Sequence, residues 1–235
     1  MEQKKEQEIL ARLRSASSSF EVIDILLNEE QTPLICKEVI SMKPSYLKYI
    51  KEQTPEICAM ALQAHFIPIH EVTPLQYVKE QTPELCMMAI KQAPWAIEYV
   101  KEQTRELCIA AVTRNGFTIG GIKEQTDELC RIAVEKNPWA IKYIKNQTPE
   151  LCLMAVKKNG YTLTDIKNQT YEICEAAVMN NPDALLDVKN LDMRKELEKR
   201  IHKPLSIAIE EAKRDKMNQN KKSQDKILKH KEPYK

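Results

Sequence analysis

The dipeptide Gln-Thr recurs seven times at a nearly constant interval, and this repeat constrains the fold more than any other feature of the chain. It begins at residues 31, 53, 81, 103, 125, 147 and 169, so successive spacings are 22, 28, 22, 22, 22 and 22 residues. A fixed period of this size is typical of repeat proteins, in which one small supersecondary unit stacks on the next. The sequence therefore predicts seven stacked units over residues 31–190, with one six-residue insertion within residues 65–76.

The sequence of each unit predicts two short helices, and residues 147–167 are the clearest copy. Thr148 suits the N-cap, and Pro149 suits the first helical position because its missing N–H would have no partner there. The next helix has one apolar face, formed by Leu, Cys, Ala and Val at positions 151, 152, 155 and 156. Residues 161–167 predict a second helix of about two turns, either α or 3₁₀.

The linker between the two helices alternates along the chain. Pro94 and Pro138 occupy it in some units, and Gly116 and Gly160 in others, so the repeats pair into doublets of 44 residues. Proline ends a helix through its own φ and the restricted residue before it, whereas glycine is expected to end it with a positive φ. We therefore expect linkers of two shapes and a corrugated edge.

The predicted fold is all-α, a solenoid of about seven 22-residue helix-turn-helix repeats with N- and C-terminal capping helices. Helices this short are marginal alone, so neighbouring units must cover each other's apolar faces. The predicted parts are N-terminal capping helices over residues 1–30, the solenoid over 31–190, a degenerate repeat with a C-terminal capping helix over 191–216, and a basic flexible tail over 217–235.

All seven cysteines fall four residues after the cap threonine of a unit. They are Cys36, Cys58, Cys86, Cys108, Cys130, Cys152 and Cys174. This slot lies on the apolar face, so we interpret them as core residues, since reduced cysteine behaves as a small hydrophobe. The odd count and the absence of CxxC pairs argue against metal binding and disulfides, and favour a reducing compartment.

The position after each cysteine should lie off the core stripe, yet it is often apolar. Met87, Ile109 and Leu153 occupy it, beside Arg131 and Glu175 in other units. If the first helices line the concave side, these residues form part of an apolar groove for a partner helix or peptide. The alternative is packing against a neighbour's second helix.

Basic residues gather toward the C-terminus. Residues 211–235 hold nine Lys/Arg against four Asp/Glu, whereas the rest of the chain holds 27 against 30. The possible contacts for a polyanion are Arg114, Lys136, Lys145, Lys157, Lys158, Lys167, Lys189, Lys221 and Lys222. Nucleic-acid binding through these residues is one hypothesis. Favourable charge at helix C-termini and a solvated tail explain them equally well.

The insertion contains His65, Phe66 and His70. Two histidines without a third ligand do not make a metal site, so we interpret the segment as a loop that could dock a partner. No Ser/His/Asp order, glycine-rich phosphate loop or HExxH motif occurs. We expect no enzymatic activity, cofactor or small-molecule substrate.

The motif QTPELC, with its lead-in Y-[IV]-K-[EN], resembles an uncharacterised domain-of-unknown-function repeat family that is abundant in giant DNA viruses and some bacteria. Residues 31–190 carry the resemblance. It implies a solenoid and a viral or host-associated setting, and it brings no catalytic residues with it.

These observations favour a non-enzymatic scaffold or adaptor that binds a protein or peptide partner along the solenoid, with nucleic-acid association as the alternative. The longest apolar runs are far shorter than the roughly 20 residues that span a bilayer, and the polar start is unlike a signal peptide. We therefore expect an intracellular protein without membrane contact, in the cytoplasm, the host cytoplasm or a virion.

Overall fold

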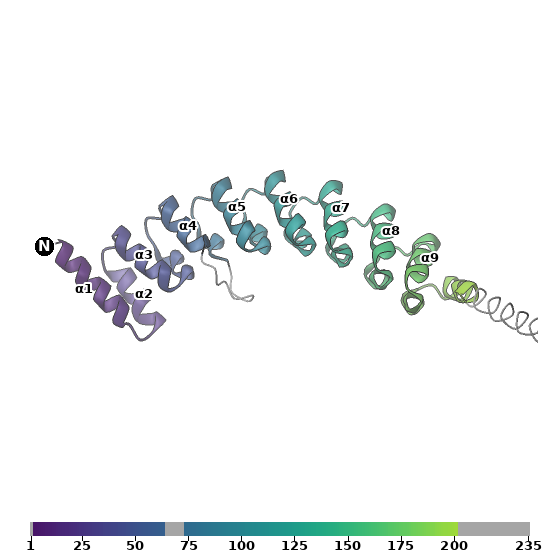
Figure 1. Cartoon of the computed structure of the whole chain (residues 1–235), viewed down its shortest axis with the longest axis horizontal. Coiled ribbons are helices and arrows are strands. Elements are labelled where there is room, and N and C mark those ends of the chain that lie inside the picture. Colours follow the sequence, from purple (N-terminus) through teal and green to yellow (C-terminus); the bar gives the residue numbers. More distant parts are fainter. Residues whose placement is uncertain (1, 64–72, 202–235) are drawn as a thin grey trace, which may run out of the picture. The chain divides into compact units, whose positions relative to one another are not determined.

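The computed structural model of this chain describes residues 2–63 and 73–201 (Figure 1). Nine α-helices and seven 3₁₀ helices follow one another from Glu2 to Asp187, and no strand occurs among the described residues. α-Helix and 3₁₀ helix alternate at the 22-residue spacing and pack in sequence order, so the predicted all-α solenoid is confirmed. The chain divides into two compact units, residues 1–146 and 147–235.

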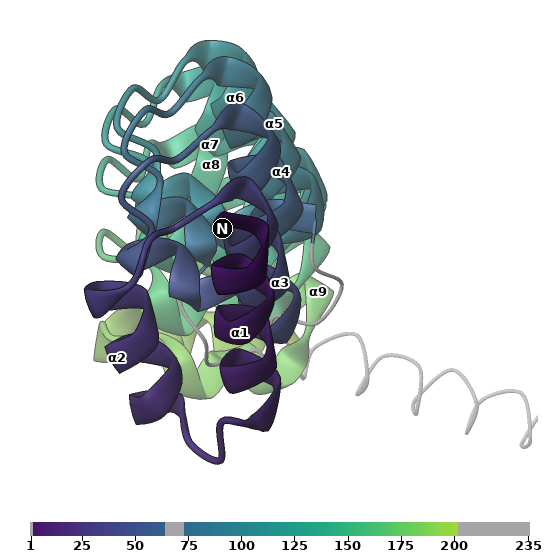
Figure 2. The same ribbon diagram turned by 90° about the vertical axis from the view of Figure 1, so that its left-hand side faces the viewer.

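The first unit begins with two α-helices, α1 (Glu2–Ser15) and α2 (Ser19–Asn28), in the segment where capping helices are predicted. Five pairs of an α-helix and a 3₁₀ helix follow. They are α3 (Pro33–Met42) with η1 (Pro44–Tyr49), α4 (Pro55–Gln63) with η2 (Pro74–Tyr77), α5 (Pro83–Gln92) with η3 (Pro94–Tyr99), α6 (Arg105–Arg114) with η4 (Gly116–Gly121), and α7 (Asp127–Lys136) with η5 (Pro138–Tyr143). In this unit the α-helices form one row and the 3₁₀ helices a second (Figures 1 and 2).

The second unit repeats the pattern with α8 (Pro149–Lys158) and η6 (Gly160–Asp165), then α9 (Tyr171–Asn180) and η7 (Pro182–Asp187). Residues 191–201 are also helical. Residues 202–235, and with them the predicted capping helix after residue 204 and the basic tail, lie outside the described residues.

The cap threonines begin the α-helices as the sequence predicts. Thr82 Oγ1 accepts the Leu85 N–H at 3.3 Å, and Thr148 does the same for Leu151 at 3.4 Å. The second helix of each pair is 3₁₀, which settles the alternative left open by the sequence. In η3 the Val100 N–H closes the last turn on the Ile97 carbonyl at 3.1 Å, an i to i−3 bond. At six residues, η3 is longer than most 3₁₀ helices, which seldom exceed three or four residues.

The predicted left-handed glycine linkers are wrong. No described residue, glycine or other, has a positive φ. Asn115 before Gly116 has φ −149° and ψ 108°, and Ala93 before Pro94 has φ −139° and ψ 100°, so both linkers are extended and alike. The edge is therefore not corrugated by two linker shapes.

Glycine stands in these linkers because of a close approach to the next α-helix. A Cβ on Gly116 would lie 2.5 Å from the Ala133 carbonyl oxygen, and one on Gly160 would lie 2.4 Å from the Ala177 oxygen. Atoms cannot approach so closely without a shift of the backbone. The linkers with glycine therefore lie closer to the next α-helix than a linker with a Cβ could, which explains why glycine alternates with proline along the chain.

The core runs between the two rows of helices. The α-helices α3 to α9 each contribute the four apolar residues of the repeat pattern, and each 3₁₀ helix contributes one or two more, such as Ala96 and Ile97 of η3. The glycine-type helices η4 and η6 also bury Thr118 and Thr162. Their hydroxyls donate to the carbonyls of Asn115 and Asn159 at 2.8 and 2.7 Å, which satisfies them.

The stretch that contains the predicted six-residue insertion, residues 65–76, ends in helix. Residues 73–76 belong to η2 or its N-cap, with Thr73 Oγ1 accepting the Leu75 N–H, so they are not part of an irregular loop. His65, Phe66 and His70 lie outside the described residues.

Candidate interaction surfaces

The glutamine of the Gln-Thr pair joins neighbouring repeats. Gln103 Nε2 donates to the carbonyl oxygen of Ile97 in η3 at 2.8 Å and to that of Gly121 in η4 at 3.0 Å. Its Oε1 accepts the Lys123 N–H at 2.8 Å. One side chain therefore bonds the C-terminal ends of two successive 3₁₀ helices, where carbonyl groups lack helical partners.

The same arrangement recurs along the chain. Gln31, Gln53, Gln81, Gln125 and Gln169 each donate to one carbonyl before them and one after, and each accepts the backbone N–H of the lysine at the end of its own unit. Gln147 makes the two bonds to Asp165 and Lys167. We call these side chains the glutamine ladder. The sequence analysis missed this role, and the signal for it was the presence of glutamine in all seven units.

The ladder ends where the glutamine is lost. Leu191 stands 22 residues after Gln169. Arg194 supplies hydrogen bonds to the end of the last 3₁₀ helix in place of a glutamine. Its guanidinium donates to the Leu186 and Val188 carbonyls at the end of η7, with Nε 3.0 Å from the Val188 oxygen. Arginine can satisfy several carbonyls but cannot accept an N–H, so it can cap a 3₁₀ helix without joining it to a following one.

All seven cysteines are free, buried thiols beside this ladder. Cys86 Sγ lies 3.8 Å from Gln81 Oε1, and Cys58 Sγ lies 3.9 Å from Gln53 Oε1, within reach of a weak S–H donor. Burial is the main cause that raises the pKa of each thiol above its ordinary value, among them Cys108. They are thus held as protonated thiols, the least reactive form.

The lysines at the end of the 3₁₀ helices bond to backbone rather than pointing only to solvent. Lys101 Nζ donates to the Lys79 carbonyl at 2.7 Å, and Lys123 Nζ donates to the Lys101 carbonyl at 2.8 Å. Lys145 and Lys189, two of the possible polyanion contacts, bond the Lys123 and Ile166 carbonyls at 3.1 and 2.8 Å. Each ammonium group thus bonds a carbonyl just beyond the 3₁₀ helix of the preceding repeat, which is a structural role.

The other possible polyanion contacts are scattered at the surface. Arg114 and Lys136 are exposed at the ends of α6 and α7, Lys157 and Lys158 at the end of α8, and Lys167 follows η6. Lys221 and Lys222 lie outside the described residues.

The proposed apolar groove residues lie on the row of α-helices. Met87 and Ile109 are half-buried on α5 and α6, Leu153 is half-buried on α8, and Arg131 is exposed on α7. In the first unit, Figure 1 places the α-helices on the outer side of the curve. The groove prediction assumed that these helices line the concave side, and in this unit they do not.

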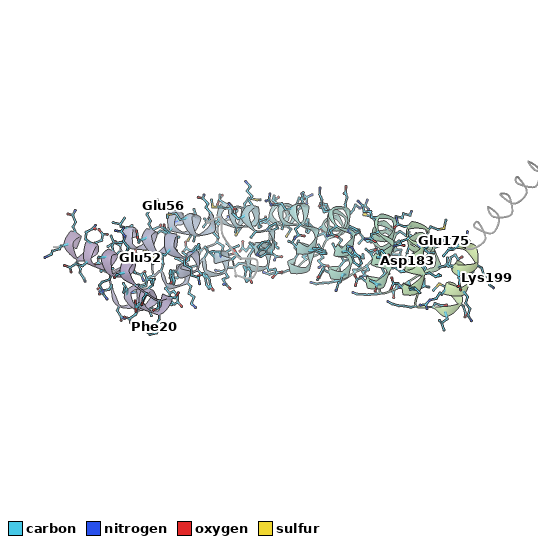
Figure 3. The ribbon with its side chains drawn as sticks, turned by 60° about the horizontal axis from the view of Figure 1, so that its bottom comes forward. Phe20, Glu52, Glu56, Glu175, Asp183 and Lys199 are labelled. Atoms are coloured by element: carbon cyan, nitrogen blue, oxygen red, sulfur yellow. The ribbon has the colours of Figure 1, made fainter. Side chains whose placement is uncertain are left out.

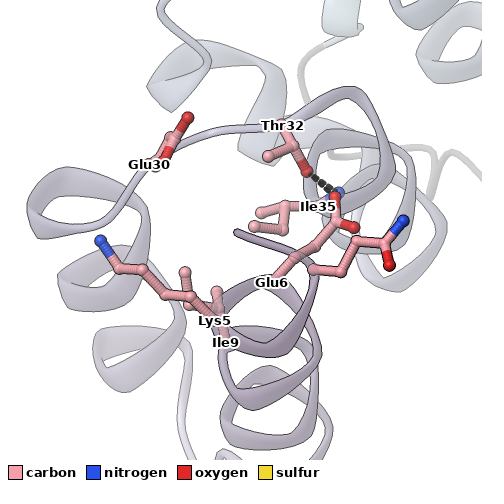
Figure 4. A pocket seen from close by; sticks show the side chains of 7 residues that line it. Lys5, Glu6, Ile9, Glu30, Thr32 and Ile35 are labelled. Carbon is pink, nitrogen blue, oxygen red and sulfur yellow. Dashed lines mark hydrogen bonds between the residues drawn. The ribbon is translucent and has the colours of Figure 1, made fainter. Parts of the chain in front are cut away.

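Shallow hollows recur at the edge that carries the glutamine ladder. One of about 320 Å³ lies between Gln53, Thr54 and Cys58 of one repeat and Lys79, Thr82 and Leu85 of the next. A second is lined by the equivalent residues one repeat later, and a third lies between α1 and α3. In this third hollow Thr32 donates to the Glu6 carboxylate, with Lys5, Ile9 and Ile35 around them (Figure 4).

No metal-binding cluster appears among the described residues. Nowhere in these ranges do three His, Cys, Asp or Glu side chains come together as metal ligands, and every buried side-chain nitrogen or oxygen has a hydrogen-bond partner. The shifted carboxylates have structural causes. The backbone N–H of Glu84 and the Thr82 hydroxyl lower the pKa of Glu84 at the start of α5, as expected for a helix N-terminus.

No described helix contains a stretch of 18 residues hydrophobic enough to form a membrane span. Comparison of the chain with family models, with curated proteins and with solved structures yields no match.

Proposed function

We propose that this chain is a non-enzymatic repeat scaffold that binds a protein or peptide partner along its row of α-helices. The observation that carries the proposal is the glutamine ladder, in which side chains such as Gln103 bond the ends of two successive 3₁₀ helices through three hydrogen bonds. Such bonding holds successive α-helices in a constant register. A rigid, regular array of helices presents side chains to a partner at little entropic cost.

The proposed contact residues are Met87, Ile109, Leu153 and Arg131. The three apolar side chains are half-buried. Met88, which follows Met87, and Met154, which follows Leu153, are half-buried as well. Methionine adapts to irregular partner surfaces and is common where a protein binds helices or peptides. Membership of the QTPELC-type repeat family, with its viral or host setting, is part of this proposal and rests on the repeated motif alone.

Nucleic acid is the second candidate partner. The exposed pair Lys157 and Lys158 and the nine basic residues of 211–235 support it. The backbone bonds of Lys101, Lys123, Lys145 and Lys189 weigh against a ladder of lysines dedicated to phosphate.

A site-specific photo-crosslinker placed at Ile109, or at Lys91 as the control, tests the proposal in cells that contain the native partner. Lys91 is exposed near the end of α5. The crosslinked protein is identified and purified, and its affinity is measured for the original chain and for Ile109→Asp, Met87→Lys and Lys91→Asp chains. A fall of about tenfold or more for the first two variants, with Lys91→Asp unchanged, would support the scaffold.

Recovery that depends on nucleic acid, and is abolished by nuclease, would instead support the second candidate. Circular dichroism and urea unfolding of each variant separate a lost contact from a lost fold.

A further inference from the structure

The second helix of the first unit, α2, has two apolar faces. α2 buries Val22, Ile25 and Leu26 against the rest of the unit. On its other side Phe20 is 78% exposed and Leu27 is 55% exposed, and Ile23 between them is half-buried. Positions i, i+3 and i+7 fall on one stripe of an α-helix, so these three side chains form a continuous apolar face, which we call the α2 face. Figure 3 shows Phe20 at the outer edge of this unit.

Such a face is unusual at the end of a repeat array. Terminal capping helices normally present a polar outer surface, because no further repeat covers them. α1 follows this rule: it buries Ile9, Leu10 and Leu13, and apart from Ala11 its described exposed side chains are polar. α2 does not, although it lies at the same end of the unit.

The surroundings of the α2 face are acidic. Residues 15–36 contain no lysine or arginine and four acidic residues, Glu21, Asp24, Glu29 and Glu30. At about 100° per residue, Asp24 lies next to the stripe and Glu21 just beyond it. Glu29 is paired with Arg12 of α1, whereas Glu21 accepts hydrogen bonds from the backbone N–H and hydroxyl of Ser17, which are uncharged donors. A complementary partner must be apolar with basic residues close by.

The C-terminal part of the same chain has this composition. Residues 205–228 contain Leu205, Ile207, Ile209, Ile227 and Leu228, and residues 211–235 carry nine Lys/Arg against four Asp/Glu. Opposite charges of this kind speed association and orient the partners, while the apolar contact supplies the free energy. We propose that the α2 face of one chain binds the basic C-terminal segment, residues 205–235, of a second copy.

Self-association of this kind joins two different surfaces. A heterologous contact leaves one α2 face and one C-terminal segment unused in every dimer, so it continues into longer open assemblies or closes into a ring. This inference goes beyond the proposed scaffold function and concerns a different surface, so the two can fail independently.

Two full-length variants test the proposal. The face variant carries Phe20→Glu and Leu27→Glu, and the tail variant carries Lys213→Gln, Arg214→Gln, Lys216→Gln, Lys221→Gln and Lys222→Gln. Sedimentation velocity is measured on nuclease-treated protein. At about 50 mM salt the sedimentation coefficient of the original chain should rise with protein concentration, and at about 0.5 M salt the chain should dissociate to monomer. Each variant alone should remain monomeric.

An equimolar mixture of the two variants should form dimers and nothing larger, since the intact tail of the face variant meets the intact face of the tail variant. Met179→Glu is the matched control, because Met179 is also a highly exposed apolar side chain, at 76%, but on α9. It should associate like the original chain. A monomeric original chain at every concentration, association that survives the face substitutions, or a mixture without dimers would each overturn the proposal.

Discussion

The backbone N–H of Lys123 is donated to the side-chain Oε1 of Gln103, 2.8 Å away and 20 residues earlier in the chain. This bond closes one repeat, and the amide nitrogen of the same Gln103 side chain donates to the Ile97 carbonyl of the repeat before it. Helices this short are marginally stable on their own. The glutamine bonds, which recur along the chain, therefore help to keep neighbouring helices packed. Solenoid stability is a sum of such nearest-neighbour terms.

Gln103→Ala removes three hydrogen bonds and leaves the Ile97 and Gly121 carbonyls and the Lys123 N–H without that partner. We expect a loss of about 2–4 kcal/mol in the free energy of unfolding, because part-buried polar groups are costly to leave unsatisfied. Urea unfolding followed by circular dichroism measures it. Gln92→Ala, at an exposed position of α5, is the control and should change stability by less than about 0.5 kcal/mol. Equal effects of the two substitutions would show that the ladder contributes little.

Gly116→Ala separates a steric role from a conformational one. Its new Cβ would lie 2.5 Å from the Ala133 carbonyl oxygen, a backbone atom of the next helix, so we expect destabilisation of about 1–3 kcal/mol. Gly120→Ala is the matched control, since its Cβ would approach only the Tyr143 side chain, at 3.3 Å. Thermal unfolding of both variants gives the comparison. Because neither glycine has a positive φ, a loss at Gly120 as large as that at Gly116 would contradict the contact explanation.

The buried cysteines predict a fall in stability at alkaline pH. Burial raises the pKa of thiols such as Cys108 and Cys152, so in the window above the ordinary thiol pKa the unfolded chain loses protons that the folded chain keeps. Stability is therefore complete below the unfolded pKa of about 8.5 and declines as pH rises toward the folded values. Urea midpoints should be lower at about pH 9.5 than at about pH 7.5.

A chain with Cys108→Ala and Cys152→Ala is the control for this pH effect. It should show a shallower decline, although its midpoint at neutral pH is lower because of the lost packing. A decline of unchanged size would assign the pH effect to other groups.

Arg194→Ala tests the end of the ladder in the second unit. Loss of the guanidinium exposes the Leu186 and Val188 carbonyls, so we expect η7 and residues 191–201 to open more readily. Hydrogen exchange should show about tenfold faster exchange there, with α8 little changed. Arg200→Ala, which removes an exposed pair with Glu175, is the control and should have a small effect. Faster exchange throughout the unit would mean that Arg194 acts on the whole unit.

Much of the architecture could be predicted from local patterns. The threonine caps, the apolar face with its cysteine and the start of each α-helix depend on residues within a few positions of one another, and the period shows that they repeat. A structural role for the lysines was one of two alternatives that the sequence left open, because positive charge is favoured at helix C-termini. The bond from Lys101 to the Lys79 carbonyl supports that alternative.

Other features depend on contacts between repeats, and local patterns misled or were silent there. Asn159-Gly160 has the sequence of a left-handed helix stop, but the backbone is extended and glycine is required by the Ala177 carbonyl of the next helix. The groove prediction depended on which row of helices lies inside the curve, which no single repeat determines.

The sequence by itself determined the period, the helical class, the cap of each α-helix and the buried place of the cysteines, because these follow from spacing along one chain segment. Only the tertiary structure decided that glutamine joins the repeats, that the glycines admit a neighbouring carbonyl and that Phe20 and Leu27 face outward. Each of these depends on groups far apart in the chain or on which side of a helix is left uncovered, and such relationships exist only once the helices are packed.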